Sequence, residues 1–146
     1  MRCLLQRVLE ASVSVEGVLA GQIGPGLLVL VGVEKRDSSN FITRMADRLV
    51  NYRIFSDKDG KMNHSIRHVE GEILLVSQFT LAAETKNGTR PSFSNAALPK
   101  IAERVFKDLS AELSERGVPV KTGVFGANMQ VSLINDGPVS FLLEVQ

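Results

Sequence analysis

The sequence predicts an α+β fold in which two main helices cover one mixed, curled sheet. Short apolar or alternating runs of strand length occur in both halves of the chain. Only two longer segments repeat apolar residues at helical spacing. Short connections suit a mostly antiparallel, barrel-like sheet. Because the 146 residues contain no linker or low-complexity tract, we expect a single domain spanning residues 1–146.

The composition is that of an ordinary globular protein, with 44% hydrophobic and 23% charged residues. The net charge is +1, so contact with nucleic acid would need a local basic face. The single cysteine, Cys3, cannot form an internal disulfide, and this favours a reducing compartment. Polar Gln6 and Arg7 come too early for a signal peptide, and no apolar run approaches the ~20 residues that cross a bilayer. We therefore expect a cytoplasmic protein without a membrane span.

The first third of the chain predicts strands separated by tight turns. Residues 12–16 alternate polar and apolar side chains, whereas residues 27–33 form an apolar run typical of a buried strand. The expected strands are residues 2–9, 12–16, 18–23 and 27–33, with turns at Gly17 and at residues 24–26. The glycines here do not indicate a phosphate-binding loop, since such a loop should open a helix and a strand follows instead.

An amphipathic helix is predicted to end near residue 52. Phe41, Met45 and Leu49 recur at helical spacing, and residues 37–39 supply N-cap candidates. Residues 53–55 then predict a short strand. Residues 56–61 predict a turn, because the Asp-x-Asp-Gly pattern there lacks the other ligands of a calcium loop.

The two histidines, His64 and His68, are four residues apart, a separation that aligns two imidazoles on a helix face. Gly60 and Gly71 leave little room for that helix. We expect surface histidines, with a metal site as the alternative.

The chain is organised around residues 72–81, an apolar run that becomes polar at its end. The four aliphatic residues 73–76 are too few for a helix core and suit a strand buried on both faces. Ser77, Gln78 and Thr80 then place two hydroxyls and an amide where the apolar run stops. Buried polar side chains cost roughly 1 to 3 kcal/mol each unless hydrogen-bonded, so these need partners or a ligand. The alternative is a strand that runs into a loop, with its polar residues capping backbone groups.

The second half of the chain predicts a polar loop at residues 82–95, a helix and more strands. Pro99 opens the helix and Gly117 ends it. Its apolar face is expected to contain Ile101, Ala102, Val105, Phe106, Leu109 and Leu113. Basic residues on its other side form a solvated face or contact phosphate, namely Lys100, Arg104 and Lys107. The last strands are expected at residues 118–124, 130–134 and 139–145, with residues 135–138 as a hairpin turn.

Two motifs now stand together: Ser-Gln-Phe-Thr at residues 77–80 and Gly137-Pro138. With Arg-Pro-Ser-Phe-Ser at residues 90–94 and Asn-Asp-Gly-Pro-Val at residues 135–139, they resemble the D-aminoacyl-tRNA deacylase family, which includes D-tyrosyl-tRNA deacylases. The resemblance extends from Gln6 to the C-terminus. One departure is Ser140, where the family usually has Thr and where the hydroxyl is kept.

The resemblance implies a homodimeric, cytoplasmic hydrolase that cleaves the ester joining a D-amino acid, or glycine, to the terminal ribose of tRNA. Such an enzyme serves translation quality control. In this family the Gly-Pro bond is cis, and each subunit inserts it into the active site of its partner, so active sites lie at the subunit interface. No metal and no organic cofactor is implied.

The candidate site residues divide by role. Ser77, Gln78, Phe79 and Thr80 are the catalytic candidates, and Gly137 and Pro138 are candidates for chiral selection. Phe125 and Met129 correspond to residues that the family places near the adenosine or amino-acid pocket, with core packing as the alternative. Lys86, Arg90 and Lys100 are the candidates for phosphate contacts to tRNA.

The chemistry also follows from the residue types. Enantiomers exchange hydrogen and side chain at Cα, so a rigid backbone wall can reject one hand and still admit glycine. No base is evident beside the hydroxyls, and no Gly-x-Ser-x-Gly elbow exists. Backbone N–H groups around Gln78 and Phe79 are candidates for an oxyanion hole. The ribose hydroxyl beside the ester activates water in the route that we favour over a covalent Thr80 intermediate.

Two other functions fit the same residues. A general esterase would use Ser77 or Thr80 as a conventional nucleophile and would not need RNA. A non-catalytic nucleic-acid-binding dimer would show salt-sensitive binding without turnover.

Overall fold

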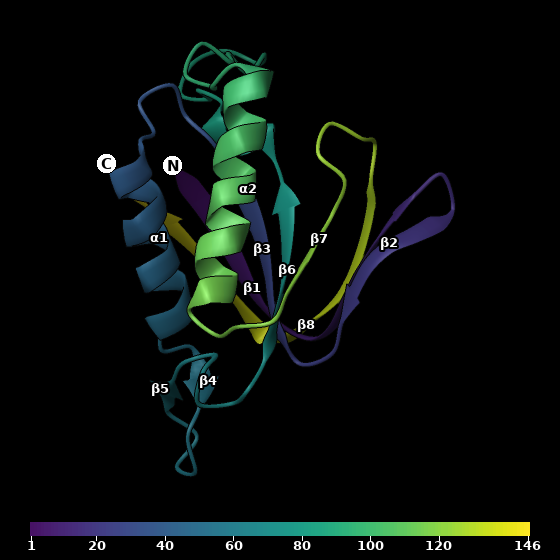
Figure 1. Cartoon of the computed structure of the whole chain (residues 1–146), viewed down its shortest axis with the longest axis vertical. Coiled ribbons are helices and arrows are strands. Elements are labelled where there is room, and N and C mark those ends of the chain that lie inside the picture. The colour runs from purple at the N-terminus through teal and green to yellow at the C-terminus, as the bar shows by residue number, and fades with distance from the viewer.

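Two helices lie against one face of a six-stranded mixed sheet (Figure 1). The computed structural model describes residues 1–146. The strands are β1 (Arg2–Val15), β2 (Val18–Ile23), β3 (Gly26–Gly32), β4 (Phe55–Ser56), β5 (Met62–His64), β6 (Glu72–Ser77), β7 (Val120–Thr122) and β8 (Gln130–Glu144). The helices are α1 (Ser39–Asn51), α2 (Pro99–Glu115) and the short 3₁₀ helix η1 (Phe79–Ala82). Strands β4 and β5 form a separate two-stranded sheet.

The long strand β1 connects the two halves of the main sheet. It pairs antiparallel with β8 on one side and with β2 and β3 on the other. Strands β3, β6 and β7 continue the sheet in parallel. The sheet curls until β2 approaches β7, where a Cβ atom on Gly21 would lie 3.0 Å from the Thr122 carbonyl oxygen. The predicted fold class, a mixed and curled sheet with two covering helices, is confirmed.

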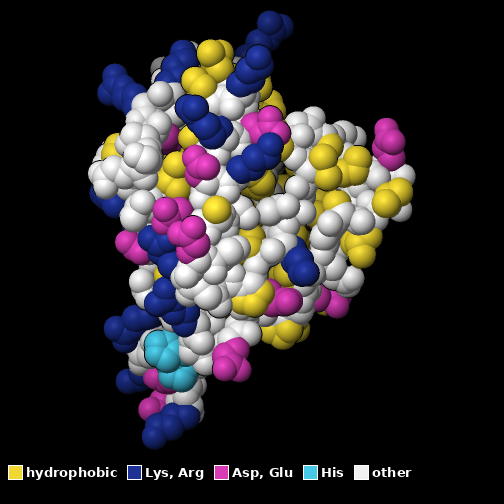
Figure 2. Space-filling view, viewed as in Figure 1, with side chains coloured by type: hydrophobic (Ala, Val, Ile, Leu, Met, Phe, Trp, Pro, Cys, Tyr) yellow, Lys and Arg dark blue, Asp and Glu magenta, His cyan; other side chains and the backbone are white.

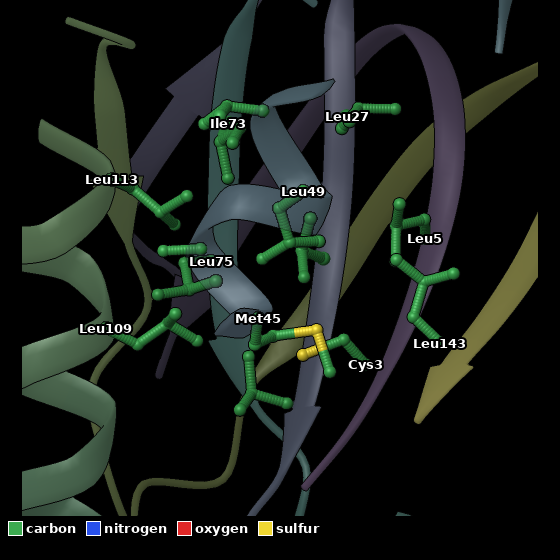
Figure 3. Close-up of a cluster of buried hydrophobic side chains, with 14 of the residues drawn as sticks. Cys3, Leu5, Leu27, Met45, Leu49, Ile73, Leu75, Leu109, Leu113 and Leu143 are labelled. Atoms are coloured by element: carbon green, nitrogen blue, oxygen red, sulfur yellow. The ribbon is translucent and has the colours of Figure 1, made fainter. Parts of the chain in front are cut away.

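Alternate residues of the central strands point to two separate apolar clusters, because side chains in a strand alternate between faces. Leu27, Val29 and Ile73 belong to the larger cluster beneath the helices (Figure 3). Leu28 and Leu74 belong to a smaller cluster on the opposite face. The predicted burial of residues 73–76 on both faces is therefore confirmed.

The cysteine belongs to the larger cluster. Cys3 is free and fully buried, and this burial raises the pKa of its thiol to about 12. The thiol is therefore neutral at physiological pH and packs as a small apolar side chain.

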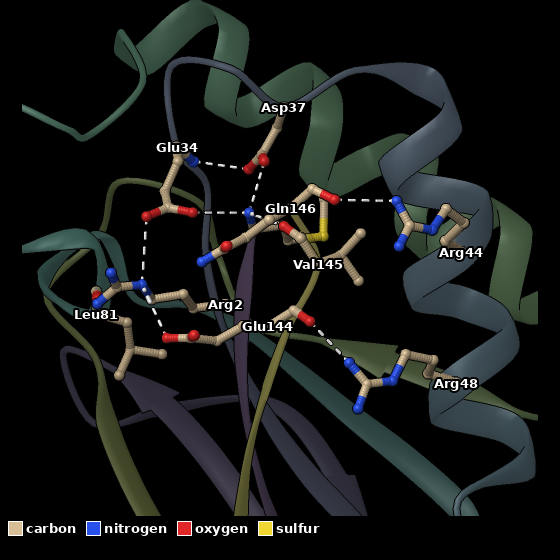
Figure 4. Close-up of polar contacts among 10 residues, drawn as sticks. Arg2, Glu34, Asp37, Arg44, Arg48, Leu81, Glu144, Val145 and Gln146 are labelled. Atoms are coloured by element: carbon tan, nitrogen blue, oxygen red, sulfur yellow. Dashed lines mark hydrogen bonds and ion pairs between the residues drawn. The ribbon is translucent and has the colours of Figure 1, made fainter.

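A buried polar cluster joins the two ends of the chain at the edge of the sheet (Figure 4). The Met1 ammonium donates to Glu34 at 2.8 Å, to Asp37 at 2.6 Å and to the Val145 carbonyl oxygen at 3.1 Å. Asp37 was a candidate N-cap, but its carboxylate binds this ammonium and the Glu34 N–H instead. The N-cap position is Ser38, and its side chain makes no capping hydrogen bond.

Helix α2 spans the predicted segment, with one difference on its apolar face. Five of the six expected residues are buried, but Ile101 is 41% exposed. Ile101 lies in the first turn of α2. Neither α1 nor α2 is long and apolar enough to cross a membrane.

The predicted hairpin at residues 135–138 is wrong. Residues 130–144 form the single strand β8, because both of its halves pair with β1. Gln6 is opposite Ser140 and Val8 is opposite Asn135, so only Arg7 of β1 faces the four residues 136–139 of β8. The extra residues form a bulge on an edge strand, and Gly137 and Pro138 within it are exposed.

Candidate active site

The apolar run of β6 ends at Ser77, as predicted, and the chain then turns sharply. Leu81 N–H donates to the Gln78 carbonyl oxygen at 3.1 Å, and Ala83 N–H donates to the Thr80 carbonyl oxygen at 3.1 Å. These bonds form η1, so Phe79 and Thr80 belong to a 3₁₀ turn. Ser77 and Gln78 are half-buried, whereas Phe79 and Thr80 are exposed. The polar end of β6 is therefore accessible to a ligand.

A cavity of about 490 Å³ opens beside this strand end. Ser77, Gln78 and Phe79 line it together with Phe125 and Met129. The remaining lining residues are Val76, Ala97, Pro99, Ala102, Gly126, Ala127, Asn128 and Val131. Mostly apolar walls with a few polar groups are typical of a small-molecule or cofactor site. The structure thus brings together five of the predicted site residues, although Thr80 does not line the cavity.

Phe125 and Met129 also pack against the core, so both alternatives for these residues apply. The rings of Phe125 and Phe106 have centroids 6.1 Å apart, and Met129 packs against the smaller apolar cluster. This packing restrains the side chains that face the cavity.

Hydrogen bonds at the strand end limit what each group can do. Gln78 Nε2 donates to Thr80 Oγ1. The Gln78 backbone N–H donates to the Val31 carbonyl oxygen at 2.8 Å, so it is already engaged within the sheet. Of the two backbone candidates for an oxyanion hole, only Phe79 therefore remains.

The two histidines lie at the opposite end of the molecule from the α2 N-terminus, in the β4–β5 region (Figure 2). Their rings are stacked, with centroids 5.0 Å apart, and His68 Nδ1 is 3.0 Å from Ser65 Oγ. They do not line the cavity. The structure contains no group of three or more His, Cys, Asp or Glu side chains arranged to hold a metal ion.

The Gly137–Pro138 segment is separated from the cavity within one chain. Its peptide bond is cis. Strands β1 and β3 lie between β8 and β6, and three strand spacings amount to about 14 Å across the sheet. Neither Gly137 nor Pro138 lines the cavity of its own chain.

Arg7 holds this bulge, and the sequence analysis did not assign it a role. Its Nε donates to the Asp136 carbonyl oxygen at 3.0 Å, and its Nη1 donates to the Ile54 carbonyl oxygen at 2.8 Å. The signal in the sequence was a long cationic side chain between the apolar residues Leu5 and Val8, next to Gln6. Only the register of β1 against β8 shows what it binds.

The three predicted phosphate-contacting residues are all exposed. Lys86 and Arg90 lie in a loop closed by hydrogen bonds between Glu84 and Ser92, and Lys100 lies in the first turn of α2. Basic side chains gather at this end of the molecule, around the start of α2 (Figure 2). Pro99 lines the cavity directly beside Lys100.

A larger hollow of about 720 Å³ lies near the chain ends. Most of its lining is charged or polar, including Lys35 and Arg36, and it contains none of the predicted site residues. Glu34 and Asp37 in its wall already pair with the Met1 ammonium. The cavity beside β6 is therefore the better candidate for an active site.

Comparisons with known proteins agree with this fold. Residues 4–144 match the model of the D-Tyr-tRNA(Tyr) deacylase family. Proteins of Yersinia pestis (strain Pestoides F) and Yersinia pseudotuberculosis (serotype O:1b), both named D-aminoacyl-tRNA deacylase, are 52% identical over 99% of this chain and 100% of their own length. These names agree with the predicted enzyme class, an ester hydrolase acting on D-aminoacyl-tRNA.

Two solved structures share the fold. One, named c-Myc DNA Unwinding Element Binding Protein, has a TM-score of 0.96 and 38% identity, and the match covers 100% of this chain and 99% of that one. The other, described as a probable eukaryotic D-amino acid tRNA deacylase, has a TM-score of 0.83 and 18% identity, and the match covers 99% of this chain and 98% of that one. Together, the family model and the full-length relatives show that this chain belongs to the D-Tyr-tRNA(Tyr) deacylase family.

Proposed function

We propose that this protein is a homodimeric D-aminoacyl-tRNA deacylase that also clears glycyl-tRNA and excludes L-aminoacyl-tRNA. The observation that carries the proposal is the cavity beside β6, where Ser77, Gln78 and Phe79 meet Phe125 and Met129 in a chain of this family. The apolar walls suit an adenine ring or an amino-acid side chain, and the strand end supplies polar groups for the ester. A cytoplasmic location, where charged tRNA is used, is part of the proposal.

The homodimer is supported by the separation of the two motifs. Gly137 and Pro138 protrude from an edge strand and do not reach the cavity of their own chain. Leu142, farther along the same strand, is also 51% exposed. A second copy that covered this strand would bury Leu142 and carry its own Gly137–Pro138 segment to the first copy's cavity.

The chiral filter would consist of backbone. At Gly137 the segment presents no side-chain atoms, and at Pro138 it presents a ring with few conformations, so its shape at a contact is nearly invariant. A wall of this kind can leave room for the hydrogen on Cα and exclude a side chain in the same place. Glycine has hydrogen at both positions, so the same wall admits it.

The catalytic step would depend on the substrate's own ribose hydroxyl. Thr80 Oγ1 has an amide as its hydrogen-bond partner, and an amide is not a general base. Both histidines lie outside the cavity. An aminoacyl ester is already reactive, so positioned water and an N–H donor for the oxyanion suffice, and Phe79 N–H is the remaining backbone candidate.

Contacts to the tRNA body would come from the exposed cations near the start of α2. Lys86, Arg90 and Lys100 can each neutralise a phosphate while the 3′ end enters the cavity. Replacing one of them with Ala should weaken binding of all tRNAs alike. It should also reduce the slope of log K against log salt concentration by about one, the value of one phosphate contact.

A second candidate function is nucleic-acid binding without catalysis. The name of the structure at 38% identity, a DNA unwinding element binding protein, favours this alternative. The same basic end of the molecule would serve both functions. A general esterase remains the third alternative, with Ser77 or Thr80 as nucleophile.

One experiment separates these functions. The protein is incubated with tRNA charged with D-tyrosine, L-tyrosine or glycine, and with a simple phenyl ester, and release of acid is followed. Our proposal expects turnover of the D-tyrosyl and glycyl substrates only. Binding without turnover would favour the nucleic-acid-binding function, and turnover of the simple ester at a similar rate would favour the esterase.

The role of Thr80 is tested in the same assay. The variant T80A should keep most of its turnover if the ribose hydroxyl activates water. A trapped acyl group on Thr80, together with binding but no turnover in T80A, would contradict the RNA-assisted route.

A further inference from the structure

The bulge on β8 lacks the hydrogen bonds that normally hold a strand. Ordinary ladder pairing stops at Asn135 and resumes at Ser140, so the backbone groups of residues 136–139 lose their partners on β1. Side chains replace those bonds at two points. Arg7 binds the Asp136 carbonyl oxygen, and Asn135 Oδ1 accepts from the Val139 N–H at 2.9 Å.

Asn135 spans the whole bulge through its own side chain. Because the Val139 N–H can only donate, the Asn135 atom facing it must be the oxygen, and this fixes the orientation of the amide. The Asn135 nitrogen then donates to Ser140 Oγ at 3.0 Å. One amide therefore connects the residue before the bulge to the last residue of the bulge and to the residue after it.

Arg7 and Asn135 have different tasks. Arg7 connects the bulge to the Ile54 carbonyl oxygen and so to the body of the molecule. The Asn135 side chain bonds only to Val139 and Ser140, and Gln6 reaches this group only through Ser140 Oγ, which lies 3.4 Å from Gln6 Nε2. Arg7 therefore sets where the bulge lies, and Asn135 sets its shape.

We propose that Asn135 is a positioning residue for stereochemical selection, holding Gly137 and Pro138 in one shape by closing the base of the bulge. This inference rests on the proposed chiral filter. Gly137 and Pro138 are both exposed, so little packing within the chain restrains them. Without the amide, the segment samples other shapes, and a wall that moves discriminates poorly between two hands of the same substrate.

The test compares Asn135→Ala with the wild-type protein on D-tyrosyl-, L-tyrosyl- and glycyl-tRNA. We expect the ratio of D- to L-tyrosyl turnover to fall roughly tenfold, since two hydrogen bonds of ordinary strength are lost. The glycyl substrate, which needs no selection at Cα, should keep a kcat within about threefold of wild type. A purely structural defect would instead lower all three rates together.

Two further variants keep the inference falsifiable if Asn135→Ala folds poorly. Asn135→Asp keeps an acceptor for the Val139 N–H and can accept from the Ser140 hydroxyl, so it should retain most of the discrimination. Ser140→Ala removes only one of the two bonds and should give an intermediate ratio. The matched control is Asn40→Ala, an exposed asparagine in the first turn of α1, which should behave as wild type.

The outcomes separate the two proposals. If the wild-type protein does not discriminate between D- and L-tyrosyl-tRNA, the proposed chiral filter fails. If the wild-type protein discriminates, and folded Asn135→Ala does so equally well, only the role of Asn135 is overturned. Thermal unfolding and sedimentation of each variant establish that fold and assembly are comparable.

Discussion

The two faces of the sheet differ in how completely a single chain covers them. The face beneath α1 and α2 carries a cluster of 26 buried residues, whereas the other face carries a cluster of seven. Leu142 on β8 is 51% exposed, and Gly137 and Pro138 in the bulge of the same strand are exposed as well. The first face therefore supplies most of the fold's stability, whereas the second leaves apolar side chains exposed in the single chain.

The largest effect on stability is expected from Leu75→Ala on the helix-covered face. Leu75 is fully buried, and removing a buried leucine side chain costs about 2 to 5 kcal/mol through lost burial and the remaining cavity. Urea unfolding should show this loss as a lower midpoint with an unchanged slope. Leu142→Ala is the matched control, and a loss of similar size there would contradict the difference between the faces.

The next largest effect, on activity, is expected from Gly137→Ala. Gly137 has a φ of +137°, and an added Cβ would lie 2.6 Å from Val139 Cγ2 and 3.0 Å from Val139 N. Backbone strain of about 1 to 3 kcal/mol would reshape the bulge, so D-tyrosyl-tRNA turnover should fall roughly tenfold to a hundredfold. Gly88→Ala also substitutes a positive-φ glycine but lies in open space, away from the bulge. Full rate and full discrimination in Gly137→Ala would overturn the proposed chiral filter.

A smaller effect, confined to assembly, is expected from Leu142→Asp. If a second copy covers this face, a buried carboxylate should weaken dimerisation by at least about tenfold, since a charge without a partner is costly to desolvate. Sedimentation across a range of protein concentrations measures this change. Val69→Asp provides a control at a 40% exposed position elsewhere. An unchanged dimer in Leu142→Asp would show that the interface lies on another surface.

The smallest effect is expected in the β4–β5 turn, away from both faces. Hydrogen bonds from the Asn63 side chain and from the Lys61 and Asp59 N–H groups lower the pKa of Asp57 below its ordinary value of 3.8. Since the folded pKa is depressed, the stabilisation is present above the unfolded pKa and is lost as the pH falls through the folded one. Asn63→Ala should raise the pKa of Asp57 toward 3.8, which an NMR titration can measure. An unchanged titration would mean that the Asn63 bond contributes little.

The sequence allowed the fold class and most elements to be predicted, because burial repeats at different periods in helices and strands. The run at residues 73–76 and the helix beginning at Pro99 were recognised in this way. The predicted burial of Ile101 was wrong, because helical spacing alone does not show how much of the apolar face the rest of the chain covers. The prediction of a hairpin at residues 135–138 was wrong, because Asn, Asp, Gly and Pro are found in bulges as well as in turns.

The sequence by itself determined the family of this protein and the candidates for its chemistry, which are the polar end of the apolar run and the Gly-Pro pair. Only the tertiary structure decided that Ser77 shares a cavity with Phe125 and Met129, and that Arg7 and Asn135 hold the bulge. The physical reason is that local patterns report which backbone and burial a residue prefers. Neighbours distant in sequence depend on strand register, and the register of β1 against β8 is set by both strands together.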